Sequence, residues 1–202
     1  MATPHKTASP GTTLLSLQTL ATASVAIGSA VDVSGSFSGM AYVQFARTVT
    51  TALTNAVQFR IDVSPQASAN GQWYPYYAWQ SDITTAVVPT ATAGSAGGNS
   101  ITLTNTGLVV GDRIFIKNGT LANSEFNRIV TLVSTTSITL EDNLINAQTT
   151  SVISNKAEWW PIYLDLTGVS RVRLAVSTAG PPGNAGQTVA VAGVLVTNDS
   201  IY

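Results

Sequence analysis

Two carboxylates and two arginines lie in an otherwise mostly apolar stretch, "LVVGDRIFIKNGTLANSEFNRIVTLV", residues 108–133. Asp112 and Glu125 could act as the acid and base of a glycosidase if the fold held them a set distance apart in a cleft. The flanking residues favour a simpler interpretation. The Gly-Asp pair separates two apolar runs, where Asp stabilises turns through its own backbone, and Asn118-Gly119 is a strong hairpin signal. Glu125 lies in the polar segment "LANSEFNR". We therefore interpret both carboxylates as parts of turns and loops.

Other residue types that perform catalysis are scattered or missing. His5 is the only histidine and lies in a polar N-terminal segment, so a Ser-His-Asp triad would have no general base. The chain has no cysteine, and zinc would need several His or Cys ligands. Four further aspartates stand singly beside turns or on alternating positions: Asp32, Asp62, Asp82 and Asp165. We therefore predict a protein that is not an enzyme and uses no metal or cofactor.

Aromatic residues are the best candidates for contacts with a partner or ligand. Five fall within seven positions and two more are adjacent: Trp73, Tyr74, Tyr76, Tyr77, Trp79, Trp159 and Trp160. Adjacent residues of a strand point to opposite faces, so both faces of each stretch would carry rings. Three interpretations remain open. The rings could form core and edge packing, a subunit interface, or a sugar-binding platform of exposed rings.

Composition limits the class of protein that these elements can build. The chain has 202 residues, of which 45% are hydrophobic and only 9% charged, with a net charge of −1. No basic run is present, so we expect no nucleic-acid partner. No window reaches the ~18 apolar residues of a membrane span, and the first residues, "MATPHKTASPGTT", lack the apolar core of a secretory signal. We expect a soluble protein made in the cytoplasm, whose weakly charged surface suits an assembly.

The pattern along the chain predicts an all-β fold. In residues 57–64, "VQFRIDVS", apolar and polar residues alternate, which is typical of a strand with one buried face. Residues 39–49 are apolar on both faces, as in a buried central strand, and Pro75 marks "WYPYYAW" as an edge strand or bulge. The Gly-rich segment 89–100 looks like a flexible linker. We predict a flexible arm at 1–13, a jelly-roll-like β-sandwich built from 14–88 and 156–202, and a small inserted β-domain at 89–155 with that linker.

Two groups of segments resemble known families of β-proteins. "SGMAYVQFARTV", "AVQFRIDVSPQ" and "WWPIYLDLTGVSRVRLAV" are similar to jelly-roll sandwiches of galactose-binding-like and related viral β-proteins. The segment "NSITLTNTGLVVGDRIFIKNGTLANSEFNRIVTLVSTTSITLEDNL" is similar to small β-modules in structural proteins of tailed bacteriophages. The resemblance implies a virion structural protein, and it carries no functional residue over to this chain.

The expectation for function follows from that resemblance and from the missing catalytic groups. It is a capsid decoration (cement) protein that binds and stabilises the assembled phage head, with the major capsid protein or other virion proteins as partners. A homo-oligomer, with a trimer favoured, would match the threefold positions of a capsid. The alternatives are a carbohydrate-binding adhesin or fibre module, and a neck or tail-completion protein.

Overall fold

The fold is that of a computed structural model, which describes residues 7–8, 11–20, 24–48, 50, 52–53, 55–68, 71–104, 107–178 and 189–199. Nearly all of the regular structure is β-strand, and the one helical element is a short 3-10 turn, η1, at Leu121–Asn123 within the described residues. No helix in that part of the chain is long and apolar enough to span a membrane.

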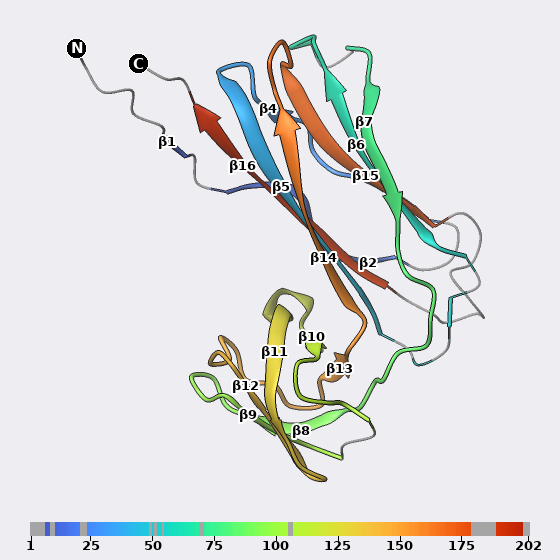
Figure 1. The fold of residues 1–202 in the computed structure, drawn as a ribbon, viewed down its shortest axis with the longest axis vertical. Coiled ribbons are helices and arrows are strands. Elements are labelled where there is room, and N and C mark those ends of the chain that lie inside the picture. The colour runs from blue at the N-terminus through green and yellow to red at the C-terminus, as the bar shows by residue number, and fades with distance from the viewer. Residues whose placement is uncertain are drawn as a thin grey trace.

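Sheet A is one layer of the larger unit (Figure 1). Its order is β2 (Thr12–Leu20), β16 (Val189–Asp199), β5 (Ser36–Arg47) and β14 (Ala157–Asp165), and the short β1 (Thr7–Ala8) pairs with the end of β16. All neighbours are antiparallel. The two central strands, β5 and β16, correspond to the most apolar segments of the sequence, which confirms the central position predicted for residues 39–49.

Sheet B is the second layer. Its order is β3 (Val25–Ile27), β15 (Arg171–Thr178), β6 (Val57–Ser64) and β7 (Tyr74–Gln80), with β4 (Val31–Asp32) beside β3 along the same edge of β15. The alternation in β6 places Val57, Phe59 and Ile61 in the core between the sheets. Pro75 lies in the outermost strand, as predicted, at a register shift against β6.

The order of strands confirms a jelly-roll-like sandwich. If β1 with β2, and β3 with β4, are each counted as one strand, the larger unit has eight strands, and their order is 1-8-3-6 in sheet A and 2-7-4-5 in sheet B. The chain thus crosses repeatedly from one sheet to the other, as it does in two nested Greek keys. The core between the sheets is formed by buried side chains of both layers, among them Val43, Phe45, Ile61 and Leu174.

The insert interrupts this sandwich between β7 and β14 and lies at one end of it (Figure 1). Its sheet has the order β13 (Val152–Ser154), β10 (Arg113–Lys117), β11 (Glu125–Val133), β12 (Ser137–Leu140), β9 (Ser100–Leu103) and β8 (Ala91–Gly94). A bridge between Thr90 and Val152 joins the two ends, so the sheet closes on itself. The insert has its own core of buried aliphatic side chains.

Three local predictions need correction. The Gly-rich segment 89–100 is not a simple linker, because β8 lies within it and buries Ala91 and Gly94, the latter against Leu144 and Gln148. Asn118-Gly119 does not form a tight hairpin. The connection instead runs through η1, and the Asn118 side chain bonds to Ala147 and Gln148 across the loop.

The third correction concerns the arm predicted at residues 1–13. Its described part is paired: Thr7 and Ala8 pair with Asp199 and Asn198, and Thr12 and Thr13 begin β2. Residues 1–6 and 9–10, including His5, lie outside the described residues.

Candidate functional site

The outer face of sheet A presents a regular array of uncharged side chains. Because Ala41, Val43 and Phe45 of β5 point into the core, Met40, Tyr42 and Gln44 point outward. The register places one residue of β14 and one of β16 beside each of these. We call this array the nine-residue grid, and its three rows are Trp159–Gln44–Ala192, Pro161–Tyr42–Val194 and Tyr163–Met40–Val196.

The nine-residue grid is accessible and almost wholly apolar. None of its residues is buried, and Tyr163 and Trp159 are 62% and 38% exposed. The rings of Tyr42 and Trp159 stack with centroids 5.6 Å apart, which gives part of the grid a rigid surface. From ordinary strand and residue spacings the grid covers about 300 Å² of sheet. Contiguous apolar patches of a few hundred Å² are often functional contact surfaces.

The insert borders the grid at one end. The next row of sheet A consists of three small residues, Ala157, Ala46 and Ala190, and these pack with Phe115 of the insert. Arg113 lies with its guanidinium carbon 6.0 Å from the centre of the Trp159 ring. The insert therefore covers the end of this face and leaves the grid beside it open.

A corner groove of about 400 Å³ continues the grid toward the insert. Gln44, Ala192 and Leu17 line it from sheet A, and Phe126, Arg128 and Ile145 are among the residues that line it from the insert. The charge of Arg128 in this lining is paired within the insert, with Glu125 at 2.7 Å and with Asp142 at 3.9 Å. The grid and the corner groove share Gln44 and Ala192, so together they form one continuous surface that runs from sheet A to the insert.

A cluster of charges fixes the two chain crossings between sandwich and insert. Lys156 lies 3.1 Å from the carboxylate of Asp82, and Glu158 accepts a hydrogen bond from the backbone of Asp82. Arg47 is completely buried beside them, and its guanidinium has no hydrogen-bond partner in the described part of the chain. Burial lowers the pKa of Arg47 and raises that of Glu158. The nearest carboxylate to Arg47 is Asp82, at 3.9 Å. Because Arg47 is buried and Asp82 already pairs with Lys156, we interpret the cluster as structural.

The seven predicted aromatics do not converge on one site. Trp159 belongs to the grid, whereas Trp160 and Trp79 point inward and pack against Phe59 at the edge of the core. Trp73 lies on the outer face of sheet B, under the guanidinium groups of two arginines. The remaining three lie exposed on edge strand β7: Tyr74, Tyr76 and Tyr77.

The carboxylates considered as catalytic groups are also dispersed. Asp112 accepts a hydrogen bond from the backbone of Val109 in its turn, as predicted. Asp32 bonds to Ser34, and Asp62 is buried beneath arginines. The prediction that Glu125 lies in a polar loop is wrong. Glu125 begins β11 and is buried, and its carboxylate is satisfied there by hydrogen bonds from Ile145, Asn146 and Gln148.

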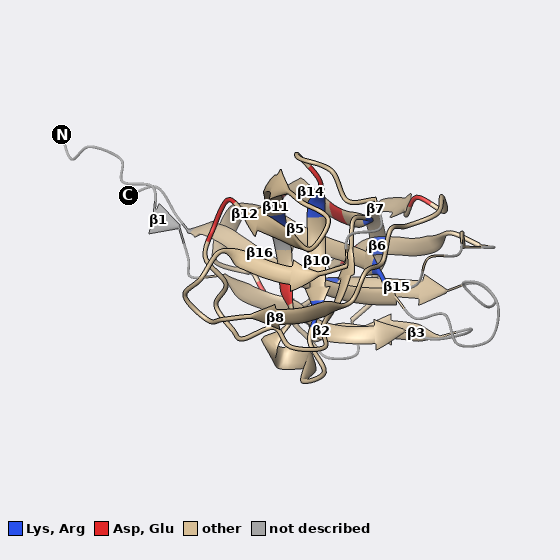
Figure 2. Ribbon diagram, turned by 90° about the horizontal axis from the view of Figure 1, so that it is seen from below, with Lys and Arg blue, Asp and Glu red and all other residues tan. Residues whose placement is uncertain are grey.

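Charged residues are sparse over both units, as Figure 2 shows by its isolated blue and red segments. In the described residues no three of His, Cys, Asp and Glu gather as a metal-binding group. No protein-family model matches the chain, and a search of curated proteins finds no match either.

Sequence reasoning missed most of the grid. Met40 and Tyr42 were visible as apolar residues, but apolar residues on both faces of a strand predict burial on both sides. The described residues cover only one side of β5 along these positions. The signal in the sequence was that the strands beside β5 also carry apolar residues at alternate positions on the face opposite the core. These are Pro161 and Tyr163 in β14 and Val194 and Val196 in β16.

Proposed function

We propose that this chain is a non-enzymatic structural protein of a virion, a capsid decoration protein that attaches to the assembled phage head through the nine-residue grid and the corner groove. The observation that carries the proposal is the grid itself. A flat, uncharged, partly aromatic sheet face buries without desolvating charges, and aromatic residues are enriched in protein interfaces. The absence of charge on this face favours a protein partner over nucleic acid.

The mechanism is mass action on a lattice. A protein that binds the assembled shell and not its separate subunits stabilises the shell by its binding free energy. Each contact can be weak, because many copies bind one symmetric particle and an oligomer binds through several sites at once. A trimer at threefold positions would present three copies of the grid to the major capsid protein.

The test is to look for the chain on particles. Virions purified from the cells that produce this protein should contain it in a fixed stoichiometry to the major capsid protein. Cryo-electron microscopy should show it at regular positions on the outer surface with sheet A toward the shell. Its absence from purified particles, or its location on the tail or neck, would overturn the proposal.

Matched variants test the surface. The double variant Tyr163→Ser with Val194→Ser should lower occupancy on particles stripped of the protein and then reloaded, by about tenfold or more, since central apolar contacts dominate interfaces. Tyr74→Ser is the control, because Tyr74 is also exposed but lies on edge strand β7. Equal loss of binding in both variants would show that the grid has no special role.

A further inference from the structure

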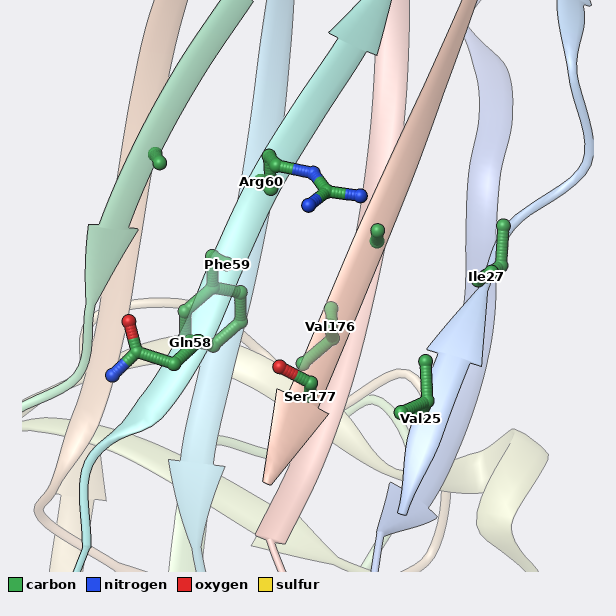
Figure 3. Close-up of a pocket in the computed structure, with 9 residues that line it drawn as sticks. Val25, Ile27, Gln58, Phe59, Arg60, Val176 and Ser177 are labelled. Carbon is green, nitrogen blue, oxygen red and sulfur yellow. The ribbon is translucent and has the colours of Figure 1, made fainter. Parts of the chain in front are cut away.

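The outer face of sheet B carries a groove of about 420 Å³ on the side of the sandwich opposite the grid. Residues of four strands line it, and Figure 3 shows Val25 and Ile27 on one side and Gln58 and Arg60 on the other. The small residue Ala175 of β15 forms the floor between them beside Arg60, and Ala78 of β7 lies on the other side of Arg60. The two walls lie on strands two positions apart, so the groove is about 10 Å wide.

Arg60 is held in place as a cation at this groove. Its Nε lies 2.6 Å from Asp62 Oδ1, and its Nη2 lies 3.2 Å from Oδ2. The Asp62 side chain is almost fully buried, whereas that of Arg60 is about half exposed. The Nη1 of Arg60 has no hydrogen-bond partner among the described residues. A guanidinium fixed in this way loses little conformational entropy when it binds an anion.

The charge around Asp62 is not balanced. Asp62 also pairs with Arg173 at 3.1 Å, so that one carboxylate serves two arginines. Trp73 packs on Arg173, whose guanidinium carbon lies 4.2 Å from the ring centre, and the Arg173 side chain is only 21% exposed. Arg60 is the only charged residue among those that line the groove. The local excess of positive charge therefore favours an anionic ligand at Arg60.

The other walls of the groove offer hydroxyl and apolar contacts. Ser177 lies between Gln58 and Val25 in the register, and its hydroxyl has no partner in the described part of the chain. Gln58 donates to Gln80 through its Nε2, which leaves its own carbonyl oxygen available as an acceptor. Val25 and Ile27 are 68% and 55% exposed on the opposite wall. The groove thus offers a cation, two neutral hydrogen-bonding groups and an aliphatic surface across a width of about 10 Å.

We propose that this groove binds a carboxylated sugar. The carboxylate would pair with the free edge of the Arg60 guanidinium. Ring hydroxyls would exchange hydrogen bonds with Ser177 and Gln58, and the C–H face of the ring would lie on Val25 and Ile27. An acidic peptide would satisfy Arg60 but would leave the neutral polar groups without matched partners, so the sugar fits the groove better. The site lies on a different face from the grid, and the proposal does not depend on the virion assignment.

The experiment is an NMR titration of the isolated full chain. A trisaccharide of glucuronic acid should shift the amide signals of Arg60, Ala175 and Ser177, and the matching glucose trisaccharide should shift them weakly or not at all. Two variants separate charge from shape. Arg60→Gln should weaken binding by about tenfold or more, and Ala175→Leu should abolish it by filling the floor while leaving every charge in place.

Arg113→Gln is the matched control, since it removes an arginine from the insert, and it should bind as the unmodified chain does. The proposal is overturned if the carboxylated trisaccharide does not bind, if the glucose trisaccharide binds equally well, or if Ala175→Leu binds normally. Equal affinity for tetraglutamate would also overturn it, because the groove would then recognise charge alone. None of these outcomes bears on attachment to particles.

Discussion

The guanidinium Nη2 of Arg128 lies 2.7 Å from the Glu125 carboxylate, and this buried ion pair holds the loop that follows β12. The other carboxylate oxygen of Glu125 accepts hydrogen bonds from the backbone of Ile145 and Asn146 and from the side chain of Gln148. One acidic side chain thus satisfies four groups from two segments of the insert. Glu125 therefore has a structural role at the wall of the corner groove.

Replacing Glu125 with alanine should destabilise the protein by about 3–5 kcal/mol, because three donors would lose their partner in a mostly buried site and Arg128 would keep only the more distant, exposed Asp142. Urea unfolding followed by circular dichroism measures the change. Glu141→Ala is the control, since Glu141 is exposed and only its backbone is bonded; it should change stability by less than about 0.5 kcal/mol. Equal effects of the two substitutions would contradict the assignment.

Glu158 should make stability depend on pH. Burial raises its pKa, so that in mild acid the folded chain binds a proton that the unfolded chain does not bind. Stability contributed by this residue therefore rises as the pH falls from 7 through the raised pKa, and levels off below the ordinary pKa of a glutamate. Urea unfolding across this range should show the unmodified protein gaining stability relative to Glu158→Gln. A constant difference between the two proteins would exclude the effect.

Asp82 should respond in the opposite direction. The Thr84 hydroxyl, which donates to its carboxylate at 2.6 Å, lowers the pKa of Asp82, and Lys156 adds to this. Its stabilising contribution is present above the ordinary aspartate pKa and is lost only in stronger acid. Asp82→Asn should therefore cost about 1–2 kcal/mol at neutral pH, and the cost should disappear in strong acid. A cost that persists unchanged in strong acid would count against this account.

The insert should be removable. Val87 and Asn155 lie side by side at the chain crossings, with the Val87 amide 2.9 Å from the Asn155 side chain and the Asn155 amide 3.3 Å from the Val87 carbonyl. An Asn-Gly turn in place of residues 88–154 should therefore join β7 to β14 without moving either. We expect a folded sandwich that has lost on the order of 2 kcal/mol, since Phe115 no longer covers the three alanines. Collapse of the dispersed methyl NMR signals would show that the two units fold only together.

Aromatic residues of the core and of edge strand β7 should differ in how much each contributes to the stability of the fold. Phe59 is buried, with its ring centre 4.9 Å from that of Trp160 and 5.3 Å from that of Trp79. Phe59→Ala should cost about 3–5 kcal/mol of stability. Tyr77 is 49% exposed, and Tyr77→Ala should cost less than about 1 kcal/mol. Thermal unfolding of the two variants checks the division, and a large loss for Tyr77→Ala would assign edge strand β7 to the core.

Local patterns predicted the fold because they are set by neighbours along the chain. The alternation around Phe59 and the proline in β7 each indicate strand type and position without knowledge of the partners. Glu125 could not be interpreted in this way, because its backbone donors lie 20 and 21 residues away. The grid was missed for a related reason. The apolar character of a residue such as Met40 indicates that its side chain should be covered from water. Whether the same chain or another molecule covers it depends on tertiary structure.

Strand β8 shows a further limit. Its residues are small, and small residues are typical of linkers, so composition indicated flexibility. In the insert the same residues allow close packing, because Gly94 lies within contact distance of Leu144 and Gln148. The bridge between Thr90 and Val152 then closes the sheet. Closure of this kind depends on residues about 60 positions apart, and no local pattern reports it.

Pro75 and Pro161 stand in β7 and β14, the outermost strands of the two sheets on one side of the sandwich. Each removes a backbone donor from an open border, where another copy could otherwise add its own strand. Growth by strand addition into fibrils is therefore disfavoured on this side. A contact between copies on this side would therefore have to be made by side chains and not by a shared backbone ladder.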